Sequence, residues 1–407
     1  MADALTNPAA TRRFGRKREA IIAAATEIIN RRGVKGMTLA GVAERVGLIT
    51  TSVTYYFKKK EALAAACFDV GIERLAELVR LAGQAPSPSD RLLRLIGLYL
   101  ELRARITAGE EPPIPVFSDI RALSPPFQGP VVAAYAGLFR AIRALFWTLG
   151  MEWLDAPSAT ARTQMVLEQL HWSQAWLHRY DVQDYPRVRD RMHDILVRGM
   201  ALPQANWSPA PLTPAQPGGA DLARETFLLA ATRLINHRGY RGASVEKISA
   251  ALNVTKGAFY HHHNAKDDVV IACFERAFAV VRGVQNAALD LPGDGWGRLS
   301  AAAAALVEFQ FSAHGPLLRT SALSALPEAI REQMVAQSDR LSARFAAMIS
   351  DAIAEGSVRP VDALIAAQMM GATLNAAADL PAILQGMDGA DAVEVYARPM
   401  LMGVLSR

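Results

Sequence analysis

Two stretches of the sequence gather hydroxyl, imidazole and ammonium groups at close spacing. The first is TTSVTYYFKKKE at residues 50–61, and the second is KGAFYHHHNAKD at residues 256–267. Such side chains can hydrogen-bond to base edges or to phosphate oxygens of a nucleic acid. The histidine run in the second stretch is consecutive, whereas helical zinc sites use histidines at i and i+4. We therefore expect no metal site and no cofactor.

Both stretches belong to an internal repeat. At a constant offset of 206 residues, segment 18–68 aligns without a gap with segment 224–274, and 14 of the 51 pairs are identical. Asn30 pairs with Asn236 and Cys67 with Cys273. A period this long indicates a duplicated domain rather than a solenoid.

A linker is expected between the two copies at residues 203–219. Its sequence, PQANWSPAPLTPAQPGG, holds five prolines and two glycines and has no apolar periodicity. A chain of this composition adopts an extended polyproline-like course with a rise of about 3.1 Å per residue. It is long enough to connect one domain to the next.

The composition indicates an all-α protein of several domains. The 407 residues are 51% apolar, alanine and leucine dominate, and alternating β-branched runs are scarce. No signal peptide and no uninterrupted apolar stretch of about 18 residues is visible, so the chain is expected to be cytoplasmic with no membrane partner. Two cysteines cannot form a disulfide framework and are expected to be small core residues.

The net charge of +5 is concentrated in the two copies of the repeat. Residues 1–80 carry 14 Lys/Arg against 8 Asp/Glu, and residues 221–282 carry 9 against 6, so the rest of the chain is acidic. Basic segments beside an acidic body suit a polyanionic partner, although a solvated surface gives the same pattern.

The local pattern of the first copy predicts a helix-turn-helix. Apolar residues from Ile21 to Ile29 recur at helical spacing, and Gly33 closes that helix. Thr38 offers an N-cap for the run LAGVAERV, and Gly47 permits a sharp turn before a short helix through Thr51 to Tyr56. The second helix of such a pair can lie in the major groove of DNA. The second copy repeats the pattern with Ser244 as cap and Asn253 at the turn.

Each copy resembles the DNA-binding head of the TetR family of bacterial repressors. Heads of that family run from a Gly-hydrophobic-Thr/Ser-Lys-Gly turn through a Tyr-Tyr/His-Phe cluster to Lys-Glu. This chain has GLITTSVTYYFKKKE at 47–61 and NVTKGAFYHHHNAKD at 253–267. It departs from the pattern at Ile49, Thr51 and Thr54, and again at His263. The two heads are therefore expected to prefer different bases.

The resemblance implies which side chains contact DNA. Those expected to face the bases are Thr50, Thr51, Thr54 and Tyr55 in the first head, and Lys256, Gly257, Tyr260 and His261 in the second. Those expected to contact phosphates or position helices are Thr38, Tyr56, Lys60, Ser244, His262 and Lys266. Tyr56 and His262 could equally pack between helices. The basic residues 12–18 could enter a minor groove or form a solvated tail.

The resemblance also implies the domain organisation. DNA-binding domains are expected at 14–75 and 220–281, and helical effector-binding and dimerisation domains at 86–202 and 293–407. Candidate effector-binding residues are Phe117, Tyr135, Phe139, Trp147, His171, Trp172, Phe309, Met334 and Asn375. The alternative is that these side chains only fill the core.

Proteins of this family generally act as homodimers. Here the covalent linker keeps the copies at high effective concentration, so we expect a monomeric pseudo-dimer in which helices near 159–180 and 186–200 pack on helices near 364–384 and 390–405. The expected function is that of a repressor released from double-stranded operator DNA, with two unlike half-sites, by a small-molecule effector. No catalytic motif points to an enzyme. The alternative is a helical scaffold or sensor in which only the second head binds DNA.

Overall fold

The computed structural model describes residues 8–148, 151, 153–212, 222–239, 247, 250, 266–326 and 328–407. Throughout these residues the ordered elements are helices, with one isolated β-bridge between Ala201 and Val358 and no strand, so the all-α fold expected from the sequence is confirmed. The chain divides into two compact units, Met1–Ala76 with Arg105–Leu138, and Glu77–Ala104 with Phe139–Arg407.

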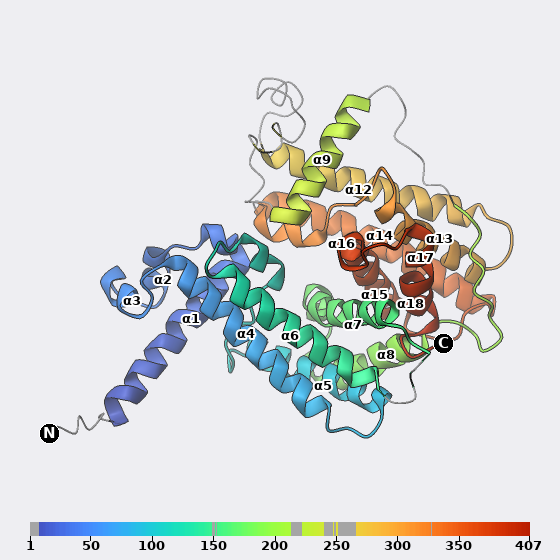
Figure 1. Ribbon diagram of the computed structural model, residues 1–407. Helices are drawn as coiled ribbons and strands as arrows, with labels where there is room; N and C mark the ends of the chain where they lie inside the picture. The colour runs from blue at the N-terminus through green and yellow to red at the C-terminus, as the bar shows by residue number, and fades with distance from the viewer. Residues whose placement is uncertain are drawn as a thin grey trace. The chain divides into compact units, whose positions relative to one another are not determined.

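The first unit holds the first helix-turn-helix (Figure 1). Its elements are α1 (Pro8–Gly36), α2 (Leu39–Arg45), α3 (Thr50–Tyr56), most of α4 (Lys60–Ala82), η1 (Phe117–Ala122) and the first part of α6 (Gln128–Phe146). Ile21, Val42, Val53 and Phe68 are buried at its centre. Gly33 interrupts α1 with φ 66°, so the helix proper ends where the sequence predicts.

The second unit holds helices from both copies. The first copy contributes most of α5 (Pro88–Thr107), α7 (Ala156–Trp176), η2 (Leu177–Arg179), η3 (Val182–Asp184) and α8 (Tyr185–Arg198). The second copy contributes α9 (Leu222–Arg238), α12 (Lys266–Leu289), α13 (Gly295–Phe311), η6 (Thr320–Ala325), α14 (Glu328–Ala354), α15 (Ala363–Ala376), η7 (Ala377–Asp379), α16 (Leu380–Ile383), α17 (Gly389–Ala392), the π-helical turn η8 (Val393–Ala397) and α18 (Arg398–Met402).

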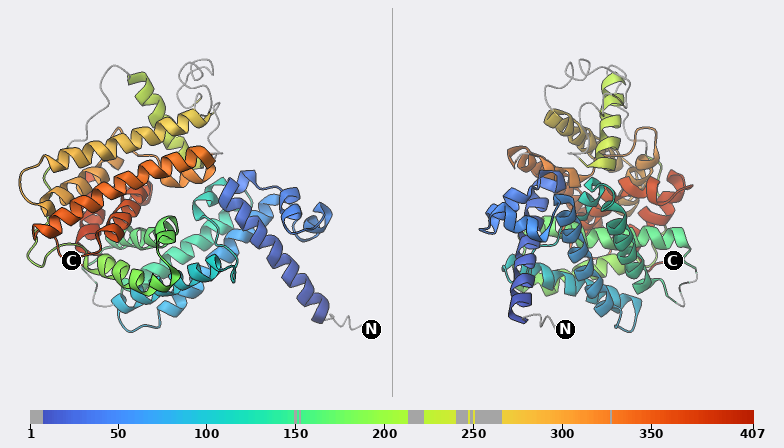
Figure 2. Two further views of the ribbon diagram at one scale, coloured as in Figure 1. Left: turned by 180° about the vertical axis from the view of Figure 1, so that it is seen from behind. Right: turned by 60° about the vertical axis from the view of Figure 1, so that its left-hand side comes forward.

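Helices of the two copies pack directly on one another within this second unit. α7 packs on α15 and η8, and α8 packs on α15 (Figure 2). Backbone hydrogen bonds also join the copies where α8 and α18 end, from Met200 N–H to the Leu401 carbonyl at 2.7 Å and from Val404 N–H to the Leu196 carbonyl at 2.8 Å. These are the helix pairs that the sequence analysis expected to meet.

The described part of the linker lies against the second copy. The rings of Trp207 and Trp296 pack edge to face with centroids 6.5 Å apart. The Trp207 indole donates to Glu394 at 2.9 Å, and the Trp296 indole donates to the Asn206 carbonyl at 2.9 Å. The composition of the linker predicts only an extended spacer, but Trp207 fixes the described part of the linker to α13 and η8.

α6 is the one helix in the described part of the chain that is long and apolar enough to cross a membrane. Core helices of soluble proteins pass the same test of length and composition, so this is weak evidence. The helix contains Arg140 and Arg143 and therefore lacks the uninterrupted apolar stretch of a typical span.

Candidate functional site

The α2–turn–α3 segment is stabilised at both of its predicted turning points. The Thr38 hydroxyl caps α2 by accepting a hydrogen bond from Gly41 N–H at 3.0 Å. Gly47 has φ 66°, a left-handed conformation that favours glycine. Ile49 stands at the N-cap of α3 and supplies no side-chain hydrogen bond. The departure from the family pattern at Ile49 therefore leaves α3 without a capping hydroxyl.

One face of α3 projects hydroxyl groups into solvent. Thr50 and Thr51 are exposed, and the Tyr55 side chain is 68% exposed. Val53, on the opposite face, is fully buried and anchors the helix. Thr54 is half-buried, and its hydroxyl donates to the Thr51 carbonyl at 2.9 Å. Among the residues expected to face DNA in this head, Tyr55 is therefore a large aromatic side chain that is exposed.

An aromatic cluster joins α1 to α3. The Phe14 ring lies 4.6 Å from that of Tyr56 and 6.1 Å from that of Tyr55, measured between centroids. Tyr56 is half-buried, and its ring also packs edge to face on that of Tyr55. Phe14 was not among the predicted site residues, because it lies before the repeat begins.

The basic residues before the repeat are helical. α1 begins at Pro8 and therefore includes this segment. Arg16, Lys17 and Arg18 are exposed on α1, and the Arg18 guanidinium lies 5.3 Å from the centre of the Phe57 ring. The positive charge is therefore carried on the same helix as Phe14, and Arg18 lies beside Phe57, the residue that follows α3.

Lys60 connects helices in the first head. Its ammonium group donates to the Lys35 carbonyl near the end of α1 at 3.5 Å. A cation near a helix C-terminus is favoured by the unpaired carbonyl groups there. Of the two roles expected for Lys60, this contact supports helix positioning.

An asparagine at the same repeat position connects the first helix of each copy to a later segment of the same copy. The Asn30 side chain donates to the Ile114 carbonyl at 2.9 Å and accepts from Val116 N–H at 2.9 Å. In the second copy, Asn236 donates to the Leu317 carbonyl at 2.8 Å and accepts from Arg319 N–H at 3.0 Å. The identity of the two asparagines was visible in the repeat, but the contact was not, because the bonded segments lie outside the aligned residues.

Most of the second candidate DNA surface lies outside the described residues. This applies to Ser244, Lys256, Gly257, Tyr260, His261 and His262, whereas Lys266 begins α12. The flanking helices repeat the first copy: Cys273 donates to the Leu228 carbonyl at 3.5 Å, as Cys67 does to the Ile22 carbonyl at 3.6 Å. Burial raises the pKa of Cys67 to about 12 and that of Cys273 to about 11, so both thiols are protonated core groups.

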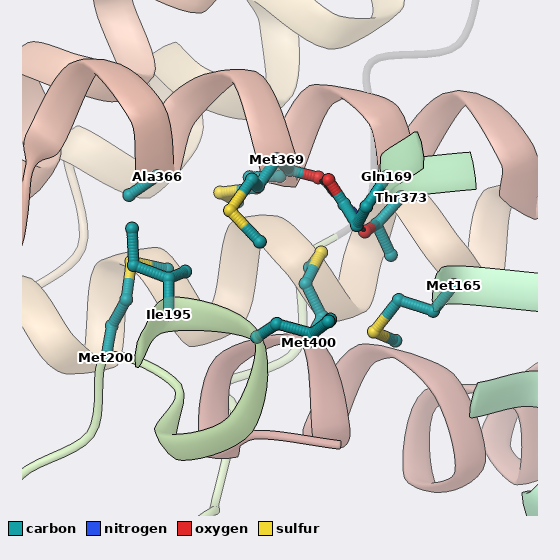
Figure 3. A pocket seen from close by; sticks show the side chains of 10 residues that line it. Met165, Gln169, Ile195, Met200, Ala366, Met369, Thr373 and Met400 are labelled. Atoms are coloured by element: carbon teal, nitrogen blue, oxygen red, sulfur yellow. Dashed lines mark hydrogen bonds between the residues drawn. The ribbon is translucent and has the colours of Figure 1, made fainter. Parts of the chain in front are cut away.

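A seam of methionines fills the junction between the copies (Figure 3). It lines a small gap between the helices and consists of Met165, Met200, Met369, Met370 and Met400. At its edge the Gln169 amide of α7 donates to the Met369 carbonyl and to the Thr373 hydroxyl of α15, both at 2.9 Å. Flexible thioether side chains fill an irregular gap of this kind, and the amide fixes the register between the helices.

A buried ion network also joins the copies. The Arg319 guanidinium of the second copy pairs with Glu168 of α7 at 3.2 Å and with Asp379. All three side chains are at most 14% exposed. Arg319 N–H is also the group that Asn236 holds, so one residue joins the second head to α7 of the first copy.

The candidate effector residue His171 lies beside this network on α7. Burial and the nearby Arg319 lower the pKa of His171 to about 4. The unfolded chain takes up a proton on His171 near pH 6.5, whereas the folded chain does so only near pH 4. Protonation therefore favours the unfolded chain, and acid is expected to destabilise the fold as the pH falls below about 6.5. Unfolding free energy measured between pH 7 and pH 4 should therefore fall by roughly 2–3 kcal/mol more in the natural chain than in His171→Phe. Equal pH profiles for the two would contradict this placement.

A larger cavity, partly open to solvent, lies between the helices of the second copy. Its volume, counted with the part open to solvent, is about 650 Å³, and it is formed by α12, α13, α14, α15, the segment before η6 and the first residue of η6. Its lining residues are Ala277, Phe278, Val281, Leu306, Gln310, Leu317, Leu318, Thr320, Ser338, Leu341, Ser342, Phe345, Gly371, Leu374 and Asn375. Of the effector residues expected in this copy, Asn375 lines the cavity, whereas Phe309 and Met334 do not.

The effector residues expected in the first copy are spread over several contacts. Phe117 and Tyr135 pack with ring centroids 5.3 Å apart. Trp147 donates to the Leu154 carbonyl at 3.0 Å, and Trp172 donates to Gln368 of the second copy at 3.4 Å. Phe139 is half-buried on α6. Trp172 thus belongs to the contact between the copies.

Comparison with known proteins matches both heads. The family described as "Bacterial regulatory proteins, tetR family" matches residues 21–67 and again 227–273, and "Tetracyclin repressor-like, C-terminal domain" matches residues 292–379. The transposon Tn10 TetC protein of Escherichia coli is 32% identical over 75 residues, 18% of this chain and 38% of TetC. The match thus spans well under half of that relative.

Solved structures of similar proteins each match about one copy. The TetR-family regulator PfmR of Thermus thermophilus is 22% identical with a TM-score of 0.38, covering 44% of this chain and 99% of PfmR. A TetR-family regulator of Bordetella parapertussis is 18% identical with a TM-score of 0.37, covering 44% of this chain and 93% of that one.

The two matched DNA-binding domains begin 206 residues apart, which is the offset of the internal repeat. A matched C-terminal domain follows the second of them. The chain is a member of the TetR family of bacterial regulators that carries two family units in tandem.

Proposed function

We propose that this chain is a transcriptional repressor that binds one operator with both heads and leaves it when a small molecule binds. The observation that carries the proposal is the exposed hydroxyl face of α3, held by the capped α2 and the Gly47 turn and repeated in sequence at the second head. An α-helix presented in this way fits the major groove. The exposed basic residues of α1 supply charge for phosphate contacts.

The chain is proposed to act as a monomeric pseudo-dimer. The packing of α7 and α8 on α15 and η8 supports this, because these contacts join one copy to the other within one chain. The covalent connection keeps the copies at high local concentration, and Trp207 fixes part of the linker to the second copy.

The operator is expected to hold two unlike half-sites. The recognition stretches differ at all seven aligned positions, TTSVTYY against KGAFYHH. If both heads read consecutive major grooves, the half-site centres should lie about 34–36 Å apart. Selection of binding DNA from a random pool tests this, and recovery of a perfect palindrome would count against two divergent heads.

Tyr55→Ala is expected to weaken binding to the selected DNA by roughly ten-fold, with the loss confined to one half-site, because one base or backbone contact is removed. Tyr260→Ala should act on the other half-site. Fluorescence anisotropy at several salt concentrations measures both effects, and affinity should fall steeply with salt. Val132→Ala, an exposed change on α6, is the control. If only Tyr260→Ala has an effect, the first head does not read DNA.

A further inference from the structure

The 650 Å³ cavity of the second copy offers no charged partner to a ligand. None of the described residues that line it is acidic or basic, and most are aliphatic or aromatic. An ionised group placed there would lose its hydration without a counter-charge, which is strongly unfavourable. The cavity is therefore suited to an uncharged molecule.

Two carboxamides in the wall supply hydrogen-bond donors. The Gln310 side-chain oxygen accepts from Leu317 N–H at 2.9 Å, and the Asn375 oxygen accepts from Thr320 N–H at 2.8 Å. Because N–H groups fix both oxygens, each amide nitrogen is the free end of its side chain. Within the described residues neither nitrogen has an acceptor, and the buried Thr320 hydroxyl has no hydrogen-bond partner there. These groups lack an acceptor that a ligand oxygen would supply.

The geometry points to a neutral, mostly apolar ligand that carries an acceptor oxygen, such as an ester, lactone or ketone, bound between the Gln310 and Asn375 amides. This inference deepens the proposed ligand response of the second copy and rests on it.

The same two amides hold the segment that reaches the second head. Gln310 and Asn375 fix the backbone at Leu317 and Thr320, and Asn236 of α9 is bonded between them, to the Leu317 carbonyl and to Arg319 N–H. A ligand that draws the two amides toward its oxygen changes their hydrogen bonds to Leu317 and Thr320. Because Asn236 is bonded to the same segment, the position of α9 changes with it. Ligand binding and DNA release would thus be coupled through one short stretch of chain.

Calorimetry on the full chain without DNA tests the ligand chemistry, with methyl octanoate, octanoate and 1-chlorooctane as probes at about pH 7.5. Methyl octanoate should bind at least roughly ten-fold more tightly than octanoate, since the carboxylate must be desolvated. Gln310→Leu and Asn375→Leu should each weaken the ester by about five-fold and leave 1-chlorooctane unchanged. Gln368→Leu, a buried glutamine outside this cavity, is the matched control.

The inference is overturned if octanoate binds as tightly as methyl octanoate, or if methyl octanoate does not bind at all. Both results are obtained with the natural chain and so do not depend on the folding of a variant. Unchanged ester affinity in both leucine variants would overturn the role of the amides. Since the measurement contains no DNA, it is independent of the heads. A chain that binds the ester but keeps its DNA affinity would contradict release by a ligand and leave the chemistry of the cavity standing.

Discussion

Replacing Gly199 by alanine is expected to lower the free energy of unfolding by about 3 kcal/mol or more. Gly199 ends α8 with φ 64°, and a Cβ atom there would lie 2.2 Å from the Leu401 carbonyl oxygen of the second copy. Backbone cannot give way as a flexible side chain can. The change should therefore open the contact between the copies at the point where Met200 N–H donates to Leu401.

Gly283→Ala is the matched control for this change. It lies in α12, and a Cβ atom there would meet nothing within 4 Å. Alanine in a helix with free space should be neutral or stabilise by up to about 1 kcal/mol. Urea unfolding followed by circular dichroism measures both variants. Equal stability of Gly199→Ala and the natural chain would contradict the described contact between α8 and α18.

Arg319→Leu is expected to destabilise the chain by about 3–5 kcal/mol, because it leaves Glu168 and Asp379 buried without their cation. The double neutralisation Glu168→Gln with Asp379→Asn, added to Arg319→Leu, should recover most of the loss. Arg331→Leu removes an exposed pair with Glu328 and should change stability by less than about 0.5 kcal/mol. Urea unfolding followed by circular dichroism measures these variants as well. If Arg319→Leu lowers the free energy of unfolding no more than Arg331→Leu does, the buried ion network is contradicted.

Local sequence signals were sufficient to predict the helix-turn-helix. The Thr38 cap and the Gly47 turn depend on interactions within a few residues, so their residue types reveal them. The repeat at 206 residues then extended the prediction to the second head, which the family comparison matched at the same offset.

Contacts between distant segments could not be predicted in this way. Phe14 meets Tyr56 across 42 positions of sequence, and Arg319 meets Glu168 across 151. The cavity wall was also hidden, because apolar residues at helical spacing look alike whether they border a cavity or fill a core. Gln310 is an example, because its place in the cavity wall and its hydrogen bond to Leu317 N–H become visible only in the structure.

The divergence of the copies has a structural counterpart. Asn30 and Asn236 make the same pair of hydrogen bonds, but the residue bound through its N–H is Val116 in the first copy and Arg319 in the second. Only the arginine can reach across to Glu168. The second copy therefore has a charged connection to its partner copy that Val116 cannot supply to the first.

We propose that one chain supplies both heads of a DNA-reading pair. Light scattering of the complex with DNA selected by the chain, at low protein concentration, counts the chains on each DNA fragment. We expect one chain of 44.0 kDa on each fragment bearing two half-sites. A complex that always contains two chains on such a fragment would contradict it.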